Sequence, residues 1–108
     1  MFAVIFEVWL RPEGRDQYLE IAAEMREKVA QIEGFISVER FQSLTEEGKL
    51  VSLSFWQSEA AIQQWRQQID HGRAQSLGRH QLFKDYRLRV AHIMRDYGPD
   101  DRQQAPNP

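Results

Sequence analysis

Apolar side chains recur along the chain with two different periods, and the change of period marks the predicted elements. Four segments are rich in β-branched and aromatic residues and are predicted to be strands: 2–10, 35–44, 49–57 and 86–97. In residues 16–33 apolar positions return every three to four residues, which predicts an amphipathic helix. Ser58 can cap a second helix, which we expect to break near His71 before a shorter helical piece at 73–83.

The ends of the first predicted helix and the link between the middle strands carry typical boundary residues. Asp16 can accept hydrogen bonds from the free N–H groups of a first turn, and Gly34 suits the left-handed backbone that often follows a helix. The link at 45–48 is short and ends in glycine, which predicts a hairpin between two antiparallel strands.

The predicted order β-α-β-β-α-β is the split βαβ, or ferredoxin-like, arrangement of the α+β class, a four-stranded antiparallel sheet with both helices on one face. The first strand carries apolar side chains on both faces, and Glu7 is an exception between Ile5 and Trp9. Two helices cover only one face of such a sheet. We therefore expect a homodimer in which a second copy covers the other face.

Composition narrows the possible chemistry. The 108 residues contain no cysteine, which excludes disulfide scaffolds, thiolate nucleophiles, iron–sulfur clusters and cysteine zinc sites. Fourteen basic against sixteen acidic residues give a net charge of −2, so no overall attraction for nucleic acid is expected. No apolar run approaches the roughly 20 residues of a membrane span, and the start does not resemble a signal peptide. We expect a cytoplasmic protein without a membrane partner, with a domain at 1–98 and a disordered tail at 99–108.

Several short stretches resemble the antibiotic biosynthesis monooxygenase (ABM) family. They are Glu33-Gly34-Phe35 before the second strand, the run from Phe55 to Ala60 that leads into the second helix, Trp65 within that helix, and His71 after it. The resemblance implies a dimeric α+β barrel with a pocket between helices and sheet in each subunit. It also implies an oxygenase that acts on a small aromatic substrate with dioxygen. Because members of the family differ in chemistry, the resemblance does not determine the reaction.

The reaction that we favour is the oxidation of a phenol or quinol to a quinone without a metal or organic cofactor. Such an enzyme needs a base to form the phenolate and a dry pocket where the phenolate meets dioxygen. His71 and Glu7 are the candidate bases. The alternatives are that His71 caps a helix end and that Glu7 forms a salt bridge with an arginine on a neighbouring strand.

Aromatic and basic residues supply the candidate substrate contacts. Trp65, Trp9 and Phe55 are candidate walls for a flat molecule, although aromatic residues at such spacing often belong to the core. Arg79 is a candidate contact for an anionic group. His92 alternates with Val90 in the last strand, so we interpret it as a core or interface residue.

Two other functions stay open. Haem-degrading members of the family carry an asparagine on the first strand, a tryptophan in the second helix and a histidine about ten residues later. Here Trp65 matches, but Glu7 and Gln75 stand at the other two positions, so a haem ligand would have to be His71 or His80. The remaining alternative is a dimer that binds a small molecule without catalysis.

Overall fold

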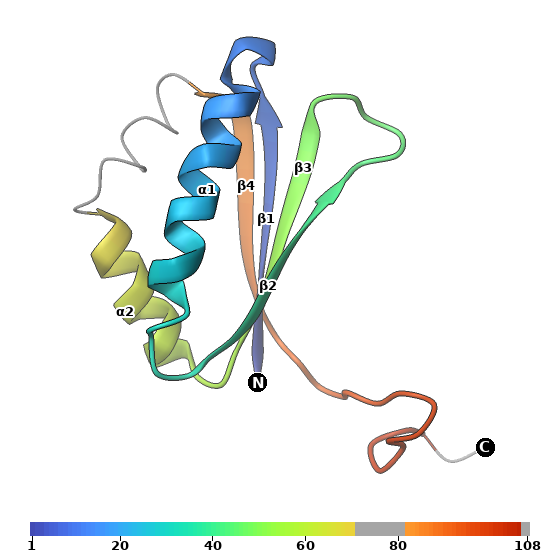
Figure 1. Cartoon of the computed structure of the whole chain (residues 1–108). Coiled ribbons are helices and arrows are strands. Elements are labelled where there is room, and N and C mark those ends of the chain that lie inside the picture. Colours follow the sequence, from blue (N-terminus) through green and yellow to red (C-terminus); the bar gives the residue numbers. More distant parts are fainter. Residues whose placement is uncertain (71–81, 107–108) are drawn as a thin grey trace.

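Four strands form one antiparallel sheet in the order β2-β3-β1-β4, and both helices pack on one of its faces (Figure 1). This computed structural model describes residues 1–70 and 82–106. The elements are β1 (Phe2–Leu10), the short 3-10 helix η1 (Pro12–Gly14), α1 (Arg15–Val29), β2 (Phe35–Gln42), β3 (Lys49–Trp56), α2 (Glu59–Asp70) and β4 (Phe83–His92). The α+β, ferredoxin-like prediction is confirmed. No helix among the described residues is long and apolar enough to cross a membrane.

The ends of α1 differ from the sequence prediction. The helix begins directly after η1, so Gly14 occupies the N-cap position without a side-chain hydrogen bond, and Asp16 lies inside the first turn. At the other end the helix stops at Val29, four residues before the predicted end. Turn-like hydrogen bonds replace the helical pattern there, including one from the Ile32 N–H to the Val29 carbonyl (3.1 Å). This turn places the buried Ile32 in the core beside α2.

The passage from β3 into α2 follows the sequence prediction closely. The Ser58 hydroxyl accepts a hydrogen bond from the Ala61 N–H (3.1 Å), so Ser58 caps α2 as expected. Gly34 has a φ of 95°, and a Cβ built on it would lie 2.9 Å from the Ala61 Cβ. Gly34 is therefore required both by its backbone conformation and by the close approach of α2.

β4 is displaced relative to the predicted strand at 86–97. It starts at Phe83, where the sequence suggested the end of a short helix, and it ends at His92 instead of Tyr97. Pairing with β1 explains the early start, because Phe83 lies opposite Leu10 and the Arg11 N–H donates to the Leu82 carbonyl (2.8 Å). Residues 73–81 of the helical piece predicted at 73–83 lie outside the described residues.

The core forms two clusters between the helices and the sheet. The first joins the start of α1 to the sheet and contains Val8, Leu10, Tyr18, Ala22, Leu50 and Leu82. The second joins α2 and the end of α1 to the sheet and contains Val29, Ile32, Trp56, Ala61 and Ile62. Trp56 is almost fully buried, and its indole N–H donates to the Ser54 hydroxyl (2.9 Å), which satisfies the polar atom inside the core.

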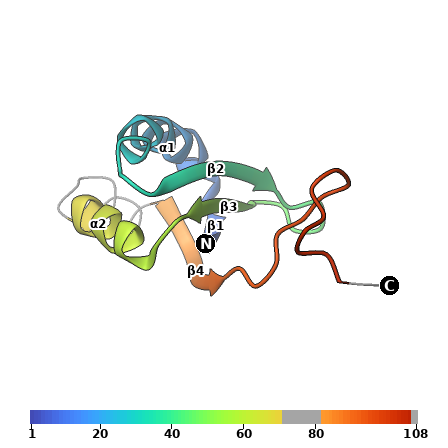
Figure 2. The same cartoon turned by 90° about the horizontal axis from the view of Figure 1, so that it is seen from below.

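After β4, residues 93–106 form an arm that leaves the sheet on the side away from the helices (Figures 1 and 2). The radius of gyration is 15.5 Å, compared with about 13 Å expected for a compact chain of this length. The arm has hydrogen bonds of its own, such as that from the Gly98 N–H to the Asp101 carbonyl (2.8 Å). Its Met94 side chain is 81% exposed.

Candidate functional site

The strand register separates the residues of the sheet into a helix side and an open side. On β1, the even-numbered residues from Phe2 to Leu10 pack against the core clusters, so they lie on the helix side. Ile5, Glu7 and Trp9 point the other way, because successive side chains of a strand alternate. The same register places Phe55 opposite Ala3, on the open side.

The sheet therefore separates the predicted substrate contacts from one another. Trp65 extends from α2 and packs, half buried, against the second core cluster on the helix side. Trp9 and Phe55 lie on the open side. Within one chain, Trp65 does not share a pocket with these two residues. His71 and Arg79 lie outside the described residues.

Glu7 is an ion-paired carboxylate on the open side. It accepts from the Lys49 ammonium (2.8 Å) and from the Arg89 guanidinium. The hydrogen bond from Lys49 lowers the pKa of the Glu7 carboxyl, desolvation opposes this change, and the charges of Lys49 and Arg89 add to the lowering. A carboxylate held in its ionised form accepts protons poorly. This arrangement matches the salt-bridge interpretation of Glu7 and weakens its case as a base.

Trp9 belongs to the same charged network. Its indole N–H donates to the Glu46 carboxylate (2.7 Å), and the Lys49 ammonium lies 4.7 Å from the centre of its ring. The ion pair with Glu7 raises the pKa of Lys49, mainly through their hydrogen bond. Network contacts thus hold Trp9 in place on the open side, where its ring forms part of a mixed charged and apolar surface.

An aromatic cluster occupies the helix side near the start of α1. Ring centroids of Phe6, Tyr18, Phe83 and Tyr86 lie 5.7 to 6.2 Å apart in the pairs that contact one another. Burial raises the pKa of the Tyr18 phenol, while the nearby Arg40 guanidinium acts in the opposite direction. Arg40 itself has a buried Nε without a hydrogen-bond partner. This end of the helix side combines the two phenylalanine rings with two phenols, Tyr18 and Tyr86, and one cation, Arg40.

The helix side of β4 carries a row of apolar side chains that stay partly open, which we call the β4 stripe. It consists of Tyr86, Leu88 and Val90, which lie opposite Val8, Phe6 and Val4 of β1. Between 41% and 45% of each side chain is exposed in the described structure. Apolar surface of this kind on the inner face of a sheet is typical of a binding site for an apolar molecule.

His92 closes the stripe at the end where Trp65 lies. The register places it opposite Phe2, and the two ring centroids are 5.0 Å apart. Phe2 packs against the same core cluster as Trp65. Of the two predicted positions for His92, the core is wrong, because its side chain is exposed in the single chain at the end of the stripe, and the interface stays a prediction. Sequence reasoning missed this site, although His92, Val90, Leu88 and Tyr86 share one parity along the strand.

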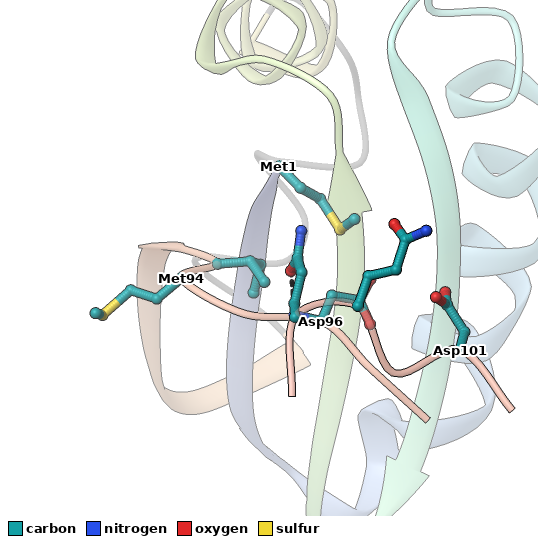
Figure 3. A pocket seen from close by; sticks show the side chains of 7 residues that line it. Met1, Met94, Asp96 and Asp101 are labelled. Carbon is teal, nitrogen blue, oxygen red and sulfur yellow. Dashed lines mark hydrogen bonds between the residues drawn. The ribbon is translucent and has the colours of Figure 1, made fainter. Parts of the chain in front are cut away.

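A separate hollow of about 280 Å³ lies where the arm leaves the sheet (Figure 3). It is lined by Met1 and by residues of the arm. In the view, the Met94 side chain extends away from Met1 and Asp101. Two carboxylates and two amides line the hollow, and none of the predicted site residues that the structure describes, Glu7, Trp9, Phe55 and Trp65, is among its lining residues. Among the residues that the structure describes, no group of three or more histidine and acidic side chains could hold a metal ion.

Comparison of the sequence with known proteins gives one family match and two similar relatives. The model of the antibiotic biosynthesis monooxygenase family matches residues 1–77. The chain is 44% identical over 93 residues to a jasmonate monooxygenase of Pyricularia oryzae, a match that covers 86% of this chain and 43% of that longer protein. It is 33% identical to the uncharacterized protein YqjZ of Bacillus subtilis, covering 87% of this chain and 80% of that protein.

Solved structures of similar fold include an antibiotic biosynthesis monooxygenase and a cofactor-independent oxygenase. SnoaB, a cofactor-independent oxygenase from Streptomyces nogalater, superposes with a TM-score of 0.76 at 10% identity, over 88% of this chain and 94% of SnoaB. At this identity the likeness shows the fold alone. The family model and the YqjZ match cover most of the chain, and from them we conclude that the chain belongs to the antibiotic biosynthesis monooxygenase family.

Proposed function

We propose that this protein is a cofactor-independent monooxygenase that oxidises an aromatic phenol or quinol to a quinone, with the substrate lying against the β4 stripe. The observation that carries the proposal is the half-open row of Tyr86, Leu88 and Val90 on the helix side of the sheet. Trp65 and Phe2 stand at one end of this row and the aromatic cluster at the other. A flat apolar ring system fits between such aromatic ends.

The reaction needs no further reductant when the substrate has an open carbon para to the phenol. A phenol and one dioxygen then give one quinone and one water, because the substrate supplies all the electrons. One oxygen atom enters the ring and the other leaves as water. Loss of the phenolic proton comes first, since the phenolate gives up an electron to dioxygen far more readily than the phenol.

The candidate base depends on which side of the sheet binds the substrate. A substrate on the β4 stripe lies on the opposite side of the sheet from Glu7, so Glu7 can serve only a substrate bound to the open side. His71 stays a proposed base and Arg79 a proposed anion contact. Trp9 and Phe55 would contact only a substrate that lies on the open side of the sheet, whether it is bound by the same chain or by a second copy.

We also propose that the protein is a cytoplasmic homodimer in which the open sides of two sheets face each other. Half-buried apolar side chains of β1 and β3, among them Ile5, Val51 and Leu53, share that face with the charged network. A second copy covers them and reduces apolar surface in water. Light scattering at micromolar concentration tests this, and a monomeric mass would refute it.

Oxygen uptake with 1,8-dihydroxyanthrone tests the activity. In its anthrol tautomer this flat molecule is a phenol whose 9-hydroxyl group has an open carbon para to it, and with one dioxygen it gives the dihydroxyanthraquinone and one water. We expect enzyme-dependent uptake matched by quinone absorbance, without added metal or reductant. A parallel titration with hemin tests the haem alternative. A saturable Soret band would overturn this proposal in favour of a haem-binding or haem-degrading function.

Jasmonic acid belongs in the same set of ligands, because the Pyricularia relative is named for jasmonate. Its apolar ring and chain suit the β4 stripe, while its carboxylate needs a cation such as Arg40 or Arg79. Quenching of tryptophan fluorescence reports binding of either ligand. Saturable binding without turnover of any ligand would favour the non-catalytic alternative.

A further inference from the structure

We infer that His92 is a catalytic residue of the proposed reaction and accepts the phenolic proton of a substrate that lies on the β4 stripe. This inference rests on the proposed function. Its basis is the position of one imidazole at the end of an open apolar surface, on the same side of the sheet as both helices.

The register places His92 on the substrate side without ambiguity. It lies opposite Phe2, as Val90 lies opposite Val4 and Leu88 opposite Phe6, and all of these β1 residues pack against the helix-side clusters. Side chains at alternate positions of a strand share one face. The imidazole therefore continues the row of Val90 and Leu88 at a spacing of two residues, about 6.8 Å along the strand from Val90.

The Phe2 ring gives the imidazole a defined neighbour. The two rings lie 5.0 Å apart with an angle of 32° between their planes, so one face of the imidazole is against Phe2. The other parts of the side chain stay exposed in the described structure. A ring system that rests on Val90 and Leu88 thus presents its edge, where a phenolic hydroxyl sits, to the imidazole.

His92 differs chemically from the other residues of the helix side of β1 and β4. Those residues are Phe2, Val4, Phe6, Val8, Leu10, Phe83, Tyr86, Leu88 and Val90, and the only other polar group among them is the Tyr86 phenol. The nearest residues of β3 on this side, Ser52 and Ser54, carry hydroxyl groups. Imidazole is the side chain that most often transfers protons near neutral pH. On this part of the described surface, only His92 can take up the proton.

The proton transfer balances in charge. The phenol O–H bond breaks, its proton moves to an imidazole nitrogen, and the electron pair stays on the phenolate oxygen. The imidazolium then lies beside the phenolate and stabilises its negative charge. Dioxygen then adds to the ring carbon and takes the imidazolium proton to form a hydroperoxide, so His92 is neutral again. The O–O bond and the C–H bond of that ring carbon break, the carbon and its bound oxygen form the new carbonyl, and the departing hydroxyl leaves with the C–H proton as water.

Steady-state kinetics of His92→Ala with 1,8-dihydroxyanthrone test the inference. We expect kcat to fall by about 100-fold or more, the usual contribution of a general base, with KM changed less than about threefold. Added imidazole should restore at least part of the lost kcat, because a free base can occupy the space left by the side chain. His92→Gln, which keeps a polar group of similar reach, should be as slow as His92→Ala.

Two matched variants provide the comparison. Arg87→Gln changes the same strand on its open side and should leave kcat within about twofold. His71→Ala tests the other histidine proposed as a base.

A His92→Ala protein with wild-type kcat would overturn the inference and leave the proposed function standing, as would a slow variant that imidazole does not rescue. A wild-type protein that binds the anthrone without oxidising it would overturn the proposed function and the role of His92 with it.

Discussion

Replacing Gly34 with alanine should destabilise the protein more than the same change at Gly48, although both residues have a positive φ. Their φ angles are 95° and 83°, so each alanine has to adopt a left-handed backbone that costs about 1–2 kcal/mol. The surroundings differ. A Cβ on Gly34 would lie 2.9 Å from the Ala61 Cβ, whereas a Cβ on Gly48 would have the Leu10 carbonyl oxygen at 3.7 Å as its nearest neighbour.

The contact with Ala61 adds a second penalty at Gly34. Neither methyl group can rotate away, so α2 has to move, and overpacking of this kind costs about 1–3 kcal/mol. We therefore expect Gly34→Ala to lower the free energy of unfolding by about 2–5 kcal/mol and Gly48→Ala by about 1–2 kcal/mol. Gly98→Ala has open space around it and should stay within about 0.5 kcal/mol of the wild type.

Urea unfolding followed by tryptophan fluorescence measures these differences, at one fixed protein concentration because the protein is proposed to be a dimer. The double variant Gly34→Ala/Ala61→Gly removes the contact and keeps the backbone strain. It should recover part of the loss, reduced by the cost of about 0.5–1 kcal/mol of a glycine in a helix. Equal midpoints for Gly34→Ala and Gly48→Ala would refute the role assigned to the contact with α2.

Three further predictions concern the charged network, the helix cap and the open side. Because its ion pairs lower the pKa of Glu7 below 4.5, they stabilise the fold above that pH and lose their effect as the carboxyl is protonated. Wild-type protein should thus lose more stability between pH 7 and pH 3 than Glu7→Gln, and parallel pH curves would contradict this. Ser58→Ala should cost about 1 kcal/mol in urea unfolding, with Ser58→Asp close to wild type, because Asp also caps helices. Leu53→Lys should shift the light-scattering mass towards the monomer if the open sides of two copies meet, and an unchanged dimer would argue against that interface.

Local patterns were sufficient for much of the fold. β1 has the predicted bounds of residues 2–10, and β2 and β3 begin where the alternation begins. Ser58 caps α2 as its hydroxyl and position suggest. The failures lie where tertiary contacts compete with local preference. Phe83 joins a strand instead of a helix because it pairs with Leu10 of β1, while the preceding Leu82 carbonyl accepts a hydrogen bond from the Arg11 N–H.

The candidate site depended on information that one strand does not contain. Both faces of β1 are apolar, so its sequence does not indicate which face the helices cover. Glu7 and Trp9 drew attention as a carboxylate and a large ring in an apolar strand, but the structure assigns them to a charged network on the open side. His92 was interpreted as a core or interface residue because it alternates with valine and methionine, and only its position opposite Phe2 shows that it ends the β4 stripe.

The sequence by itself determined the order of the elements, the position of the central strand, the cap of α2 and the left-handed backbone at Gly34. Each of these depends on interactions between residues close together in the chain. Only the tertiary structure decided which face of the sheet the helices cover, and hence which side chains share a site. That choice follows from the packing of α1 and α2 against the even-numbered residues of β1, between groups far apart in the sequence.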